Sequence, residues 1–321
     1  MLNQIRIFYV KDSKNFSDYE LLDTGEGEKL ERFGKSTFVR PYEDAVWSKC
    51  QTLGVGQGWD NIDGKFWSSK VGAKAGWTFS KNGSLGNSLK NRSFKWEMEY
   101  KGIKFLASPT PFRHLGFFPE QASHFDFIEE KIKKSAEALL PQLLAQGKEI
   151  KFLNLFGYTG VASLFALRAG AEVTHVDASK QILNWAKENQ KLNADLDEMP
   201  MRIIEDDVIK FLEREIKRGN KYDAVIMDPP KFGRGPKGEI WKIEEMLPKL
   251  LSQVKKVLSD KPLFVILTSY ATASSSLSLG YALSEMMIDF KGNIEQGELC
   301  VLEKSNKRII SLANTAIWSR I

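Results

Sequence analysis

Asp228, Pro229 and Pro230 stand at the end of an apolar run, in the segment KYDAVIMDPPKFGRGPKG. Proline has no amide hydrogen for a sheet ladder, so a strand that looks central ends abruptly here. Asp228 can accept a hydrogen bond from an exocyclic amine, and so can a carbonyl that the prolines fix. Lys231 and Phe232 follow, and they can neutralise a phosphate and stack on a base. The segment predicts a group-transfer site at a strand end, unless Asp228 only caps a turn and the prolines only end the strand.

A second group of residues predicts a ligand site. In FLNLFGYTGVAS a strand gives way to a helix, and Gly157 and Gly160 let the backbone approach a ligand closely. Asp177 ends the next strand, 20 residues after Gly157, where such folds place a carboxylate for ribose hydroxyls. Any βαβ unit needs a glycine in its first turn and often has an acid after its second strand. The two features together favour a ligand that contains a nucleoside.

The glycine spacing narrows the choice of ligand. It does not fit G-x-G-x-x-G, because the first position of that pattern is Asn154 or Leu155. The missing pyrophosphate loop argues against NAD and FAD, and S-adenosylmethionine remains as an adenosine ligand without a pyrophosphate. In IIEDDVIKFL, Asp206 or Asp207 can accept from the adenine amine while Val208 packs on the ring. Capping of the following helix explains Asp207 equally well.

These residues must be held by strands and helices that alternate in the C-terminal two-thirds of the chain. Near-continuous apolar runs predict strands, and amphipathic stretches between them predict helices. The predicted strands are residues 150–156, 172–177, 201–205, 222–228, 262–269, 298–304 and 308–318. The predicted helices are residues 122–144, 160–170, 180–193, 208–219, 243–258 and 277–287.

This alternation predicts an α/β fold, a Rossmann-like, doubly wound and mostly parallel sheet with a five-stranded parallel core. The last two strands have no helix between them, so they should form an antiparallel hairpin. The first hundred residues contain short aromatic runs broken by glycine, which predict a small β-rich barrel or sheet. Because 321 residues exceed what one core usually serves, we expect residues 1–112 to form this smaller domain and residues 113–321 the larger one.

Composition and cysteine use restrict the class of protein. The hydrophobic content of 42% and charged content of 27% are those of an ordinary globular protein, and no apolar run approaches the ~20 residues of a membrane span. The first fifteen residues lack the apolar core of a secretory signal. Two cysteines, Cys50 and Cys300, and three scattered histidines offer neither a disulfide framework nor a metal-ligand spacing. We expect a cytoplasmic protein with no metal and no membrane partner.

Positive charge is concentrated in one segment. Residues 64–104 contain nine Lys and Arg against two Glu, a net of +7, whereas the whole chain has a net charge of +5. The aromatic residues in and next to this segment include Phe66, Trp67, Trp77, Phe79, Phe94, Trp96 and Phe105. Cations interleaved with aromatic rings are typical of a nucleic-acid surface. A small β domain with an aromatic core and a solvated face of lysines has the same composition, so both interpretations stay open.

With LNLFGYTG, VDAS, EDDV and DPPKF in this order, the C-terminal two-thirds resembles the class I S-adenosylmethionine-dependent methyltransferases. Within them it is similar to the bacterial group marked by DPPKF, which includes 23S ribosomal RNA methyltransferases. The segments YELLDTGEGEKLERFG and VRPYEDAVW resemble the N-terminal part of a subgroup of these proteins. The resemblance covers most of the chain and implies S-adenosylmethionine as the cofactor.

The resemblance also implies roles for individual residues. For the cofactor it implies Gly157, Thr159 and Gly160 at the methionine part and ribose, Asp177 at the ribose hydroxyls, and Asp207 with Val208 at the adenine. Phe156 and Ala178 are also expected to bind the cofactor. GFFPEQ (116–121) is similar to a segment that lies over the cofactor, which adds Glu120 and Gln121, although the RNA enzymes tend to have Asp-Gln-Arg there. It implies Asp228, Pro229 and Pro230 as catalytic residues, and Lys231, Phe232 and Tyr270 as substrate-binding residues.

One absence separates two mechanisms within this family. Members that methylate carbon 5 of cytosine need a cysteine after the fifth strand, because its addition to carbon 6 makes carbon 5 nucleophilic. This chain has LTSYATASSS there, with Ser269 and Tyr270 and no thiol. We expect direct methyl transfer to nitrogen or oxygen of an RNA substrate, above all ribosomal RNA. The alternatives are a methyltransferase of a protein or small molecule, and a non-catalytic S-adenosylmethionine-binding protein. The sequence leaves the oligomeric state open.

Overall fold

The computed structural model describes residues 4–10, 16–51, 58–68, 75–80, 94–146, 149–270 and 275–321. The chain divides into two compact units. Unit 1 consists of Met1–Phe8, Ser123–Leu299 and Ser311–Ile321, and unit 2 of Tyr9–Ala122 and Cys300–Ile310. The division into domains at residues 112 and 113 stays a prediction. The compact units differ from this division in two places. The start of the chain, Met1–Phe8, belongs to unit 1, and the turn of the C-terminal hairpin, Cys300–Ile310, belongs to unit 2.

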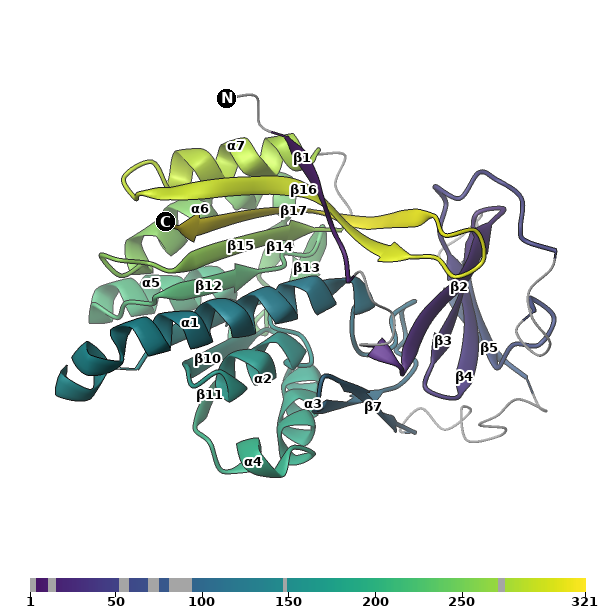
Figure 1. Ribbon diagram of the computed structural model, residues 1–321, viewed down its shortest axis with the longest axis horizontal. Helices are drawn as coiled ribbons and strands as arrows, with labels where there is room; N and C mark the ends of the chain where they lie inside the picture. Colours follow the sequence, from purple (N-terminus) through teal and green to yellow (C-terminus); the bar gives the residue numbers. More distant parts are fainter. Residues whose placement is uncertain are drawn as a thin grey trace. The chain divides into compact units, whose positions relative to one another are not determined.

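In the described residues, unit 1 contains a sheet of eight strands in the order β1-β16-β17-β15-β12-β9-β10-β11 (Figure 1). The strands are β1 (Ile5–Phe8), β9 (Lys151–Leu155), β10 (Glu172–Asp177), β11 (Met201–Glu205), β12 (Ala224–Met227), β15 (Phe264–Ser269), β16 (Gly292–Leu302) and β17 (Ile309–Arg320). β11, β10, β9, β12 and β15 run parallel, and β17 is antiparallel to β15. The predicted parallel core with a terminal hairpin is therefore confirmed.

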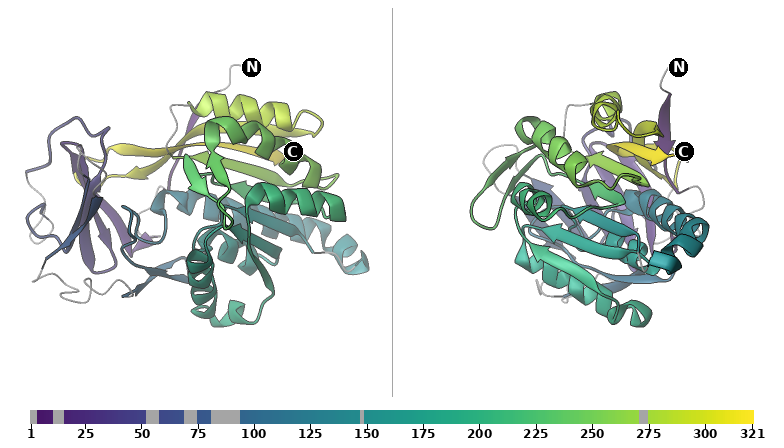
Figure 2. Two further views of the ribbon diagram at one scale, coloured as in Figure 1. Left: turned by 180° about the vertical axis from the view of Figure 1, so that it is seen from behind. Right: turned by 90° about the vertical axis from the view of Figure 1, so that its left-hand side faces the viewer.

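Helices connect the parallel strands, and Figure 2 shows them around the sheet from two further sides. They are α1 (Ala122–Gln146), α2 (Val161–Arg168), α3 (Lys180–Lys191), α4 (Ala194–Asp197), α5 (Val208–Arg218), α6 (Ile243–Val257) and α7 (Ser276–Met286). Side chains cap several of their N-termini: Ser179 begins α3, Asp207 begins α5 and Ser275 begins α7. Among the helices described, none combines the length and hydropathy that crossing a membrane requires.

Alternate residues of the parallel strands face two layers of helices. On one face, Val225 and Val265 lie in a hydrophobic core with residues of α5, α6 and α7. On the other face, the rings of Phe152 and Phe264 lie 6.3 Å apart, and Phe264 also contacts Phe127 of α1. Because both faces are covered, these strands read as continuous apolar runs.

The strand order reverses at β9. The chain passes from β9 to β10 and β11 toward one edge, and then returns to place β12 and β15 on the other side of β9. In open α/β sheets, ligands bind beyond the carboxyl ends of the strands at such a switch point. The segments after β9, β10, β11, β12 and β15 all leave the sheet at that edge.

Strand β1 was not predicted. It pairs in parallel with β16, with Ile5 opposite Gln296 and Phe8 opposite Leu299. Ile5 and Ile7 remain 56% and 54% exposed, because β1 is the outermost strand of the sheet in the described residues. A four-residue edge strand buries too little apolar surface to leave a periodic pattern in the sequence.

Unit 2 is β-rich, as predicted. In its described part, one sheet contains β2 (Tyr19–Gly25), β3 (Glu28–Phe33), β4 (Ser36–Pro41), β5 (Gly64–Ser68) and β6 (Ala75–Phe79) in sequence order. A separate hairpin is formed by β7 (Trp96–Tyr100) and β8 (Ile103–Ala107). The pairings within the larger sheet are antiparallel except β4 with β5, which is parallel.

Candidate active site

The carboxyl ends of the parallel strands bring most of the predicted residues together in unit 1. In the register, Leu155 lies beside Val176 on one side and beside Met227 on the other. The turn that contains Gly157, the side chain of Asp177 and the Asp-Pro-Pro segment therefore begin at one level of the sheet. The switch point of the fold is thus the place where the two separate sequence patterns meet.

The turn after β9 has an unusual backbone. Phe156, Tyr158 and Gly160 have φ angles of 57°, 52° and 84°, in the left-handed region that favours glycine. The Gly157 amide donates to the Val176 carbonyl at 3.0 Å. A Cβ on Gly157 would lie 2.3 Å from Cε1 of His175, so no larger residue fits above that ring.

His175, in β10, supports this turn from beneath and was not predicted as a site residue. Its Nε2 lies 3.2 Å from the Tyr158 carbonyl and its Nδ1 lies 3.0 Å from Oγ of Ser163. Burial lowers the pKa of His175 to about 4, so its ring is neutral at pH 7. A carbonyl only accepts, so Nε2 carries the hydrogen and Nδ1 accepts from the Ser163 hydroxyl, which accepts in turn from Asn154. The chain of bonds fixes one tautomer and fixes the Tyr158 carbonyl.

Asp177 joins this turn to the start of α3. One carboxylate oxygen accepts from the Tyr158 amide at 3.0 Å and the other from the Ser179 amide at 2.9 Å. Burial raises the pKa of Asp177, and these backbone hydrogen bonds counter part of that rise. The neighbouring Ala178 is half-buried. Asp177 is half-buried by exposed area, and a carboxylate that accepts from a few backbone amides still has acceptor capacity for a pair of hydroxyl groups, which fits a ribose.

Thr159 and the glycines complete the turn. Thr159 is 1% exposed, and its carbonyl accepts from the side-chain amide of Asn189 in α3 at 2.8 Å. The Gly160 amide donates to the Gly157 carbonyl at 3.1 Å, and a Cβ on Gly160 would lie 3.1 Å from Ala186. The turn is therefore held from β10 and from α3, so a ligand meets a backbone that is already shaped.

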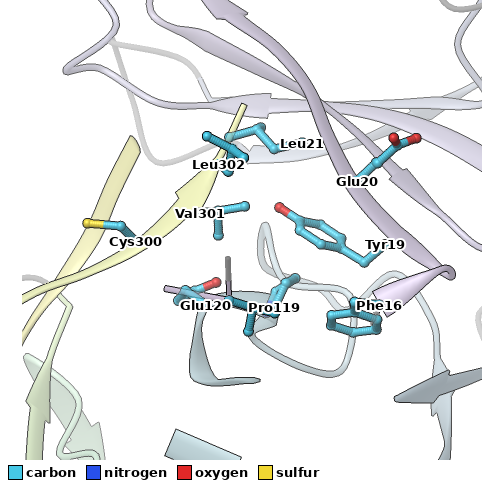
Figure 3. Close-up of a pocket in the computed structure, with 10 residues that line it drawn as sticks. Phe16, Tyr19, Glu20, Leu21, Pro119, Glu120, Cys300, Val301 and Leu302 are labelled. Carbon is cyan, nitrogen blue, oxygen red and sulfur yellow. The ribbon is translucent and has the colours of Figure 1, made fainter. Parts of the chain in front are cut away.

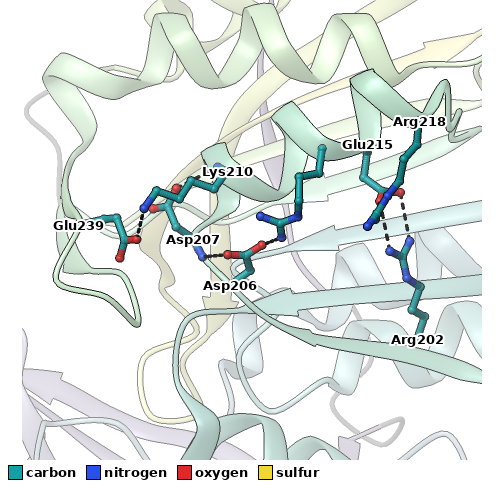
Figure 4. Close-up of polar contacts among 8 residues, drawn as sticks. Arg202, Asp206, Asp207, Lys210, Glu215, Arg218 and Glu239 are labelled. Atoms are coloured by element: carbon teal, nitrogen blue, oxygen red, sulfur yellow. Dashed lines mark hydrogen bonds and ion pairs between the residues drawn. The ribbon is translucent and has the colours of Figure 1, made fainter.

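The acids after β11 have partners within unit 1 (Figure 4). Asp207 caps α5, since its Oδ1 accepts from the Lys210 amide at 3.0 Å. Asp206 accepts from the Asp207 amide at 2.9 Å and pairs with Arg214. Val208 is 4% exposed within the hydrophobic core. The capping interpretation is what the geometry shows, and contact of Asp207 and Val208 with adenine remains a prediction.

The Asp-Pro-Pro segment directly follows β12. Asp228 is half-buried, Pro229 is buried and Pro230 is exposed. Trp241, which the sequence did not single out, donates its indole N–H to the Pro230 carbonyl at 2.6 Å. Its ring lies 4.9 Å from the ring of Phe156 in the turn after β9. Trp241 therefore contacts both the predicted cofactor turn and the predicted catalytic segment.

The glycine- and proline-rich residues after Pro230 form a hairpin. β13 (Phe232–Arg234) pairs antiparallel with β14 (Ile240–Lys242). The glycines and prolines of residues 233–238 are typical of a loop, yet part of this stretch is paired. Lys231 is exposed and Phe232 is 55% exposed, so both predicted substrate-binding side chains reach solvent.

The residues after β15 include no thiol. Ser269 is 2% exposed and lies opposite Asn314 of β17, and Tyr270 is half-buried. Residues 271–274 of the same segment lie outside the described residues. The two cysteines of the chain belong to other elements, Cys50 to the connection between β4 and β5 and Cys300 to β16.

Glu120 and Gln121 belong to unit 2, in a 3-10 helix, and both are 5% exposed. Glu120 and Tyr19 line a cavity of about 50 Å³ (Figure 3). Burial raises the pKa of Glu120, and the charge of Lys29 counters that rise. Ligand pockets have volumes of several hundred Å³, so this cavity is too small for a nucleoside. The cofactor role of Glu120 and Gln121 remains a prediction.

The basic and aromatic segment of unit 2 is described only in part. Of its nine cations, the described ones are Lys65, Lys95, Lys101 and Lys104, and the other five lie outside the described residues. Phe66 and Phe105 are buried, and the rings of Trp77 and Phe79 stack 6.0 Å apart, whereas Trp67 is 42% exposed. Most of these described rings pack within unit 2. A nucleic-acid surface on this segment remains a prediction.

Comparison with known proteins gives three kinds of match. A family model for S-adenosylmethionine-dependent methyltransferases matches residues 140–260. The crystal structure of a SAM-dependent methyltransferase from Agrobacterium tumefaciens is 37% identical, with a TM-score of 0.84 over 98% of this chain and 94% of that one. A putative methyltransferase from Streptococcus mutans shares the fold, with 17% identity and a TM-score of 0.67 over 95% of this chain and 76% of that one.

Two curated relatives carry names that refer to ribosomal RNA. Ribosomal RNA large subunit methyltransferase I of Aeromonas hydrophila is 41% identical over 42% of this chain, and methyltransferase K of Neisseria meningitidis is 37% identical over 36%. These matches span 30% and 32% of the relatives' own lengths. The chain therefore covers about a third of each of these relatives.

Proposed function

This chain belongs to the S-adenosylmethionine-dependent methyltransferases, and we propose that it methylates a nitrogen or oxygen atom of an RNA substrate, with ribosomal RNA as that substrate. The observation that carries the proposal is the meeting of the glycine turn, Asp177 and the Asp-Pro-Pro segment at the switch point of one sheet. The parallel sheet brings the ends of these strands to one edge, and at that edge the chain carries a glycine turn, a carboxylate and an Asp-Pro-Pro segment, which together suit a nucleoside-bearing ligand and its reaction.

The residues of unit 1 fit the cofactor. Asp177 has acceptor capacity for the ribose hydroxyls, and Gly157 and Gly160 bring the backbone within reach of the ligand. S-adenosylmethionine supplies a methyl group that is bonded to a sulfonium sulfur. An electron pair of the substrate can attack the carbon of that methyl group. In this proposal Asp228 accepts from the attacked amine and thereby turns its electron pair toward the cofactor. Positioning of this kind supplies up to ~7–11 kcal/mol in well-oriented reactions.

Direct transfer follows from the absence of a nucleophilic cysteine. Ser269 and Tyr270 occupy the place after β15 where a carbon-5 methyltransferase of cytosine needs a thiol. The substrate atom must then be nucleophilic already, as an exocyclic amine or a hydroxyl group is. The RNA substrate is supported by the names of the curated relatives and by Lys231 and Phe232, which stand exposed beside the catalytic segment.

Calorimetric titration with S-adenosylmethionine tests the cofactor site. Asp177→Ala should weaken binding about tenfold, because two charge-assisted hydrogen bonds to ribose are worth on the order of 1–3 kcal/mol. Asp195→Ala, at an exposed acid of α4, is the matched control and should bind as the wild type does. If the wild-type protein does not bind S-adenosylmethionine, both the cofactor and the proposed reaction are refuted.

Mass spectrometry of nucleosides tests whether ribosomal RNA is the substrate. Ribosomal RNA from a deletion strain should lack one methylated nucleoside, and purified protein with S-adenosylmethionine should restore it. If the nucleosides are unchanged while a protein or small molecule becomes methylated, the cofactor assignment stands and the RNA assignment is wrong.

A further inference from the structure

The hairpin of β13 and β14 has two faces of opposite character. In its register Phe232 lies opposite Lys242, Gly233 opposite Trp241, and Arg234 opposite Ile240. Opposite residues of an antiparallel pair share a face, and successive residues alternate between faces. Gly233 and Trp241 therefore form the inner face, and the outer face consists of Phe232, Arg234, Ile240 and Lys242.

The inner face fixes the hairpin to the active site. Trp241 is 5% exposed, contacts Phe156 and donates to the Pro230 carbonyl. At the far end of the hairpin, the Glu239 carboxylate accepts from the Lys237 amide at 2.9 Å and pairs with Lys210 of α5 (Figure 4). The hairpin is thus held at both ends, so its outer face has a defined position next to Asp228.

The outer face exposes apolar side chains. Phe232 and Ile240 are 55% and 57% exposed. They are diagonal neighbours across the ladder, within reach of each other for an aromatic ring and a long side chain. Two large apolar groups next to each other in solvent, on a segment that is fixed in place, point to a contact surface.

The same segment carries excess positive charge. Residues 231–242 contain Lys231, Arg234, Lys237, Lys242 and one acid, Glu239, a net charge of +3. Glu239 is already paired with Lys210, and Lys242 pairs with Glu245 at 2.8 Å. No side-chain ion pair to Lys231, Arg234 or Lys237 occurs among the residues that the structure describes. Three cations beside an apolar pair complement a chain of phosphates and bases.

We propose that the outer face of this hairpin docks a single-stranded segment of the RNA substrate next to the methylated nucleotide. Phosphates lie against Arg234 on this face and against Lys231 and Lys237, which precede β13 and lie in the connection to β14, and bases pack on Phe232 and Ile240. The inference rests on the proposed function and adds Arg234, Lys237 and Ile240 to the site. Cations interleaved with apolar groups favour RNA, because a single strand presents a phosphate at every nucleotide and a base beside it that can pack on an apolar side chain.

Methylation kinetics on ribosomal RNA from the deletion strain test this surface. Arg234→Glu should raise the KM for RNA about tenfold or more at 0.1 M salt, and Ile240→Ala should raise it several-fold. Arg234→Lys keeps a phosphate partner and should stay close to wild type. All three variants should bind S-adenosylmethionine as the wild type does, which shows that they fold. The salt dependence of RNA binding should be shallower for Arg234→Glu, by about one phosphate.

Lys187→Glu is the matched control, because it makes the same charge reversal at an exposed position of α3. Its KM for RNA should change less than twofold. If RNA is methylated and KM is unchanged in both Arg234→Glu and Ile240→Ala, the docking surface is refuted while the proposed function stands. If Lys187→Glu raises KM as much as Arg234→Glu does, the effect is net charge and the surface is refuted as well. If the wild type methylates no RNA, the proposed function itself has failed.

Discussion

At residue 157 the backbone passes so close to the ring of His175 that only glycine fits. The ring in turn donates a hydrogen bond to the carbonyl of Tyr158, a residue whose φ angle is positive. The two residues thus depend on each other: the small one makes room for the ring, and the ring fixes the turn. His175 is a positioning residue, since it acts on the ligand through the backbone of the turn.

This dependence predicts a non-additive pair of substitutions. Gly157→Ala should destabilise the protein by several kcal/mol and abolish binding of S-adenosylmethionine, because the new methyl group collides with the imidazole. His175→Ala removes the obstacle, so Gly157→Ala should cost much less in that background. Urea unfolding of the wild type, both single variants and the double variant measures the coupling. Additive free energies of unfolding would contradict the contact.

At the scale of elements, the hairpin of β13 and β14 joins the two halves of the candidate site. Trp241 packs on Phe156 after β9 and donates to Pro230 after β12. The glycines and prolines around it are typical of a loop, yet Trp241 at one end and the pair of Glu239 with Lys210 at the other hold the segment. The carbonyl of Pro230 is consequently fixed by the protein itself.

Trp241→Phe separates the two contacts of this residue. The phenyl ring keeps the packing on Phe156 but loses the N–H, so the Pro230 carbonyl loses a hydrogen bond worth about 1 kcal/mol. We expect kcat to fall about fivefold while the affinity for S-adenosylmethionine changes less than twofold. Trp241→Leu should also lower the affinity for S-adenosylmethionine, because this variant loses the aromatic contact with Phe156 as well. A cofactor affinity that falls equally in both variants would show that the hydrogen bond has no separate role.

At the scale of the molecule, the histidines of both units are neutral at pH 7: His124 and His175 are buried in unit 1, and His114 is half-buried in unit 2. Burial lowers the pKa of His114 in unit 2 and of His124 in unit 1 to about 3, and that of His175 to about 4. These three are the only histidines of the chain. At these histidines the unfolded chain therefore binds more protons than the folded chain between pH 6.5 and the folded pKa values of about 3 to 4.

The protein should lose stability in acid for this reason. Above pH 6.5, the pKa of an unfolded histidine, these groups cost the folded state no stability. As the pH falls from there toward 4, the free energy of unfolding decreases, because the unfolded chain takes up protons that the folded chain does not. We expect the urea midpoint to decrease steadily over that range, by an amount equivalent to several kcal/mol. His175→Gln removes one titrating group, so the urea midpoint should decrease less steeply with falling pH. A midpoint that stays constant from pH 6.5 to 4.5 would refute the assignment of neutral buried histidines.

Much of the larger unit was predictable because local patterns and chain topology determine it together. The strand at 172–177 and the first residues of α5 at 208 agree with the apolar runs and the capping acid. The aspartate after β10 could be assigned because a parallel sheet places every strand's carboxyl end at one edge. β1 could not be predicted, because its partner β16 lies almost 300 residues away and no period of four residues reports such a pairing.

The sequence by itself determined the family, the succession of strands and helices in the parallel core and the strand ends that carry Gly157, Asp177 and Asp228, because these follow from runs of residues that are close in the chain. Only the tertiary structure decided what lies beneath and behind those residues. His175 under the glycine turn, Trp241 on the Pro230 carbonyl and Lys210 on Glu239 are contacts across elements. They depend on where side chains point once the sheet is packed, and no spacing along the chain encodes that.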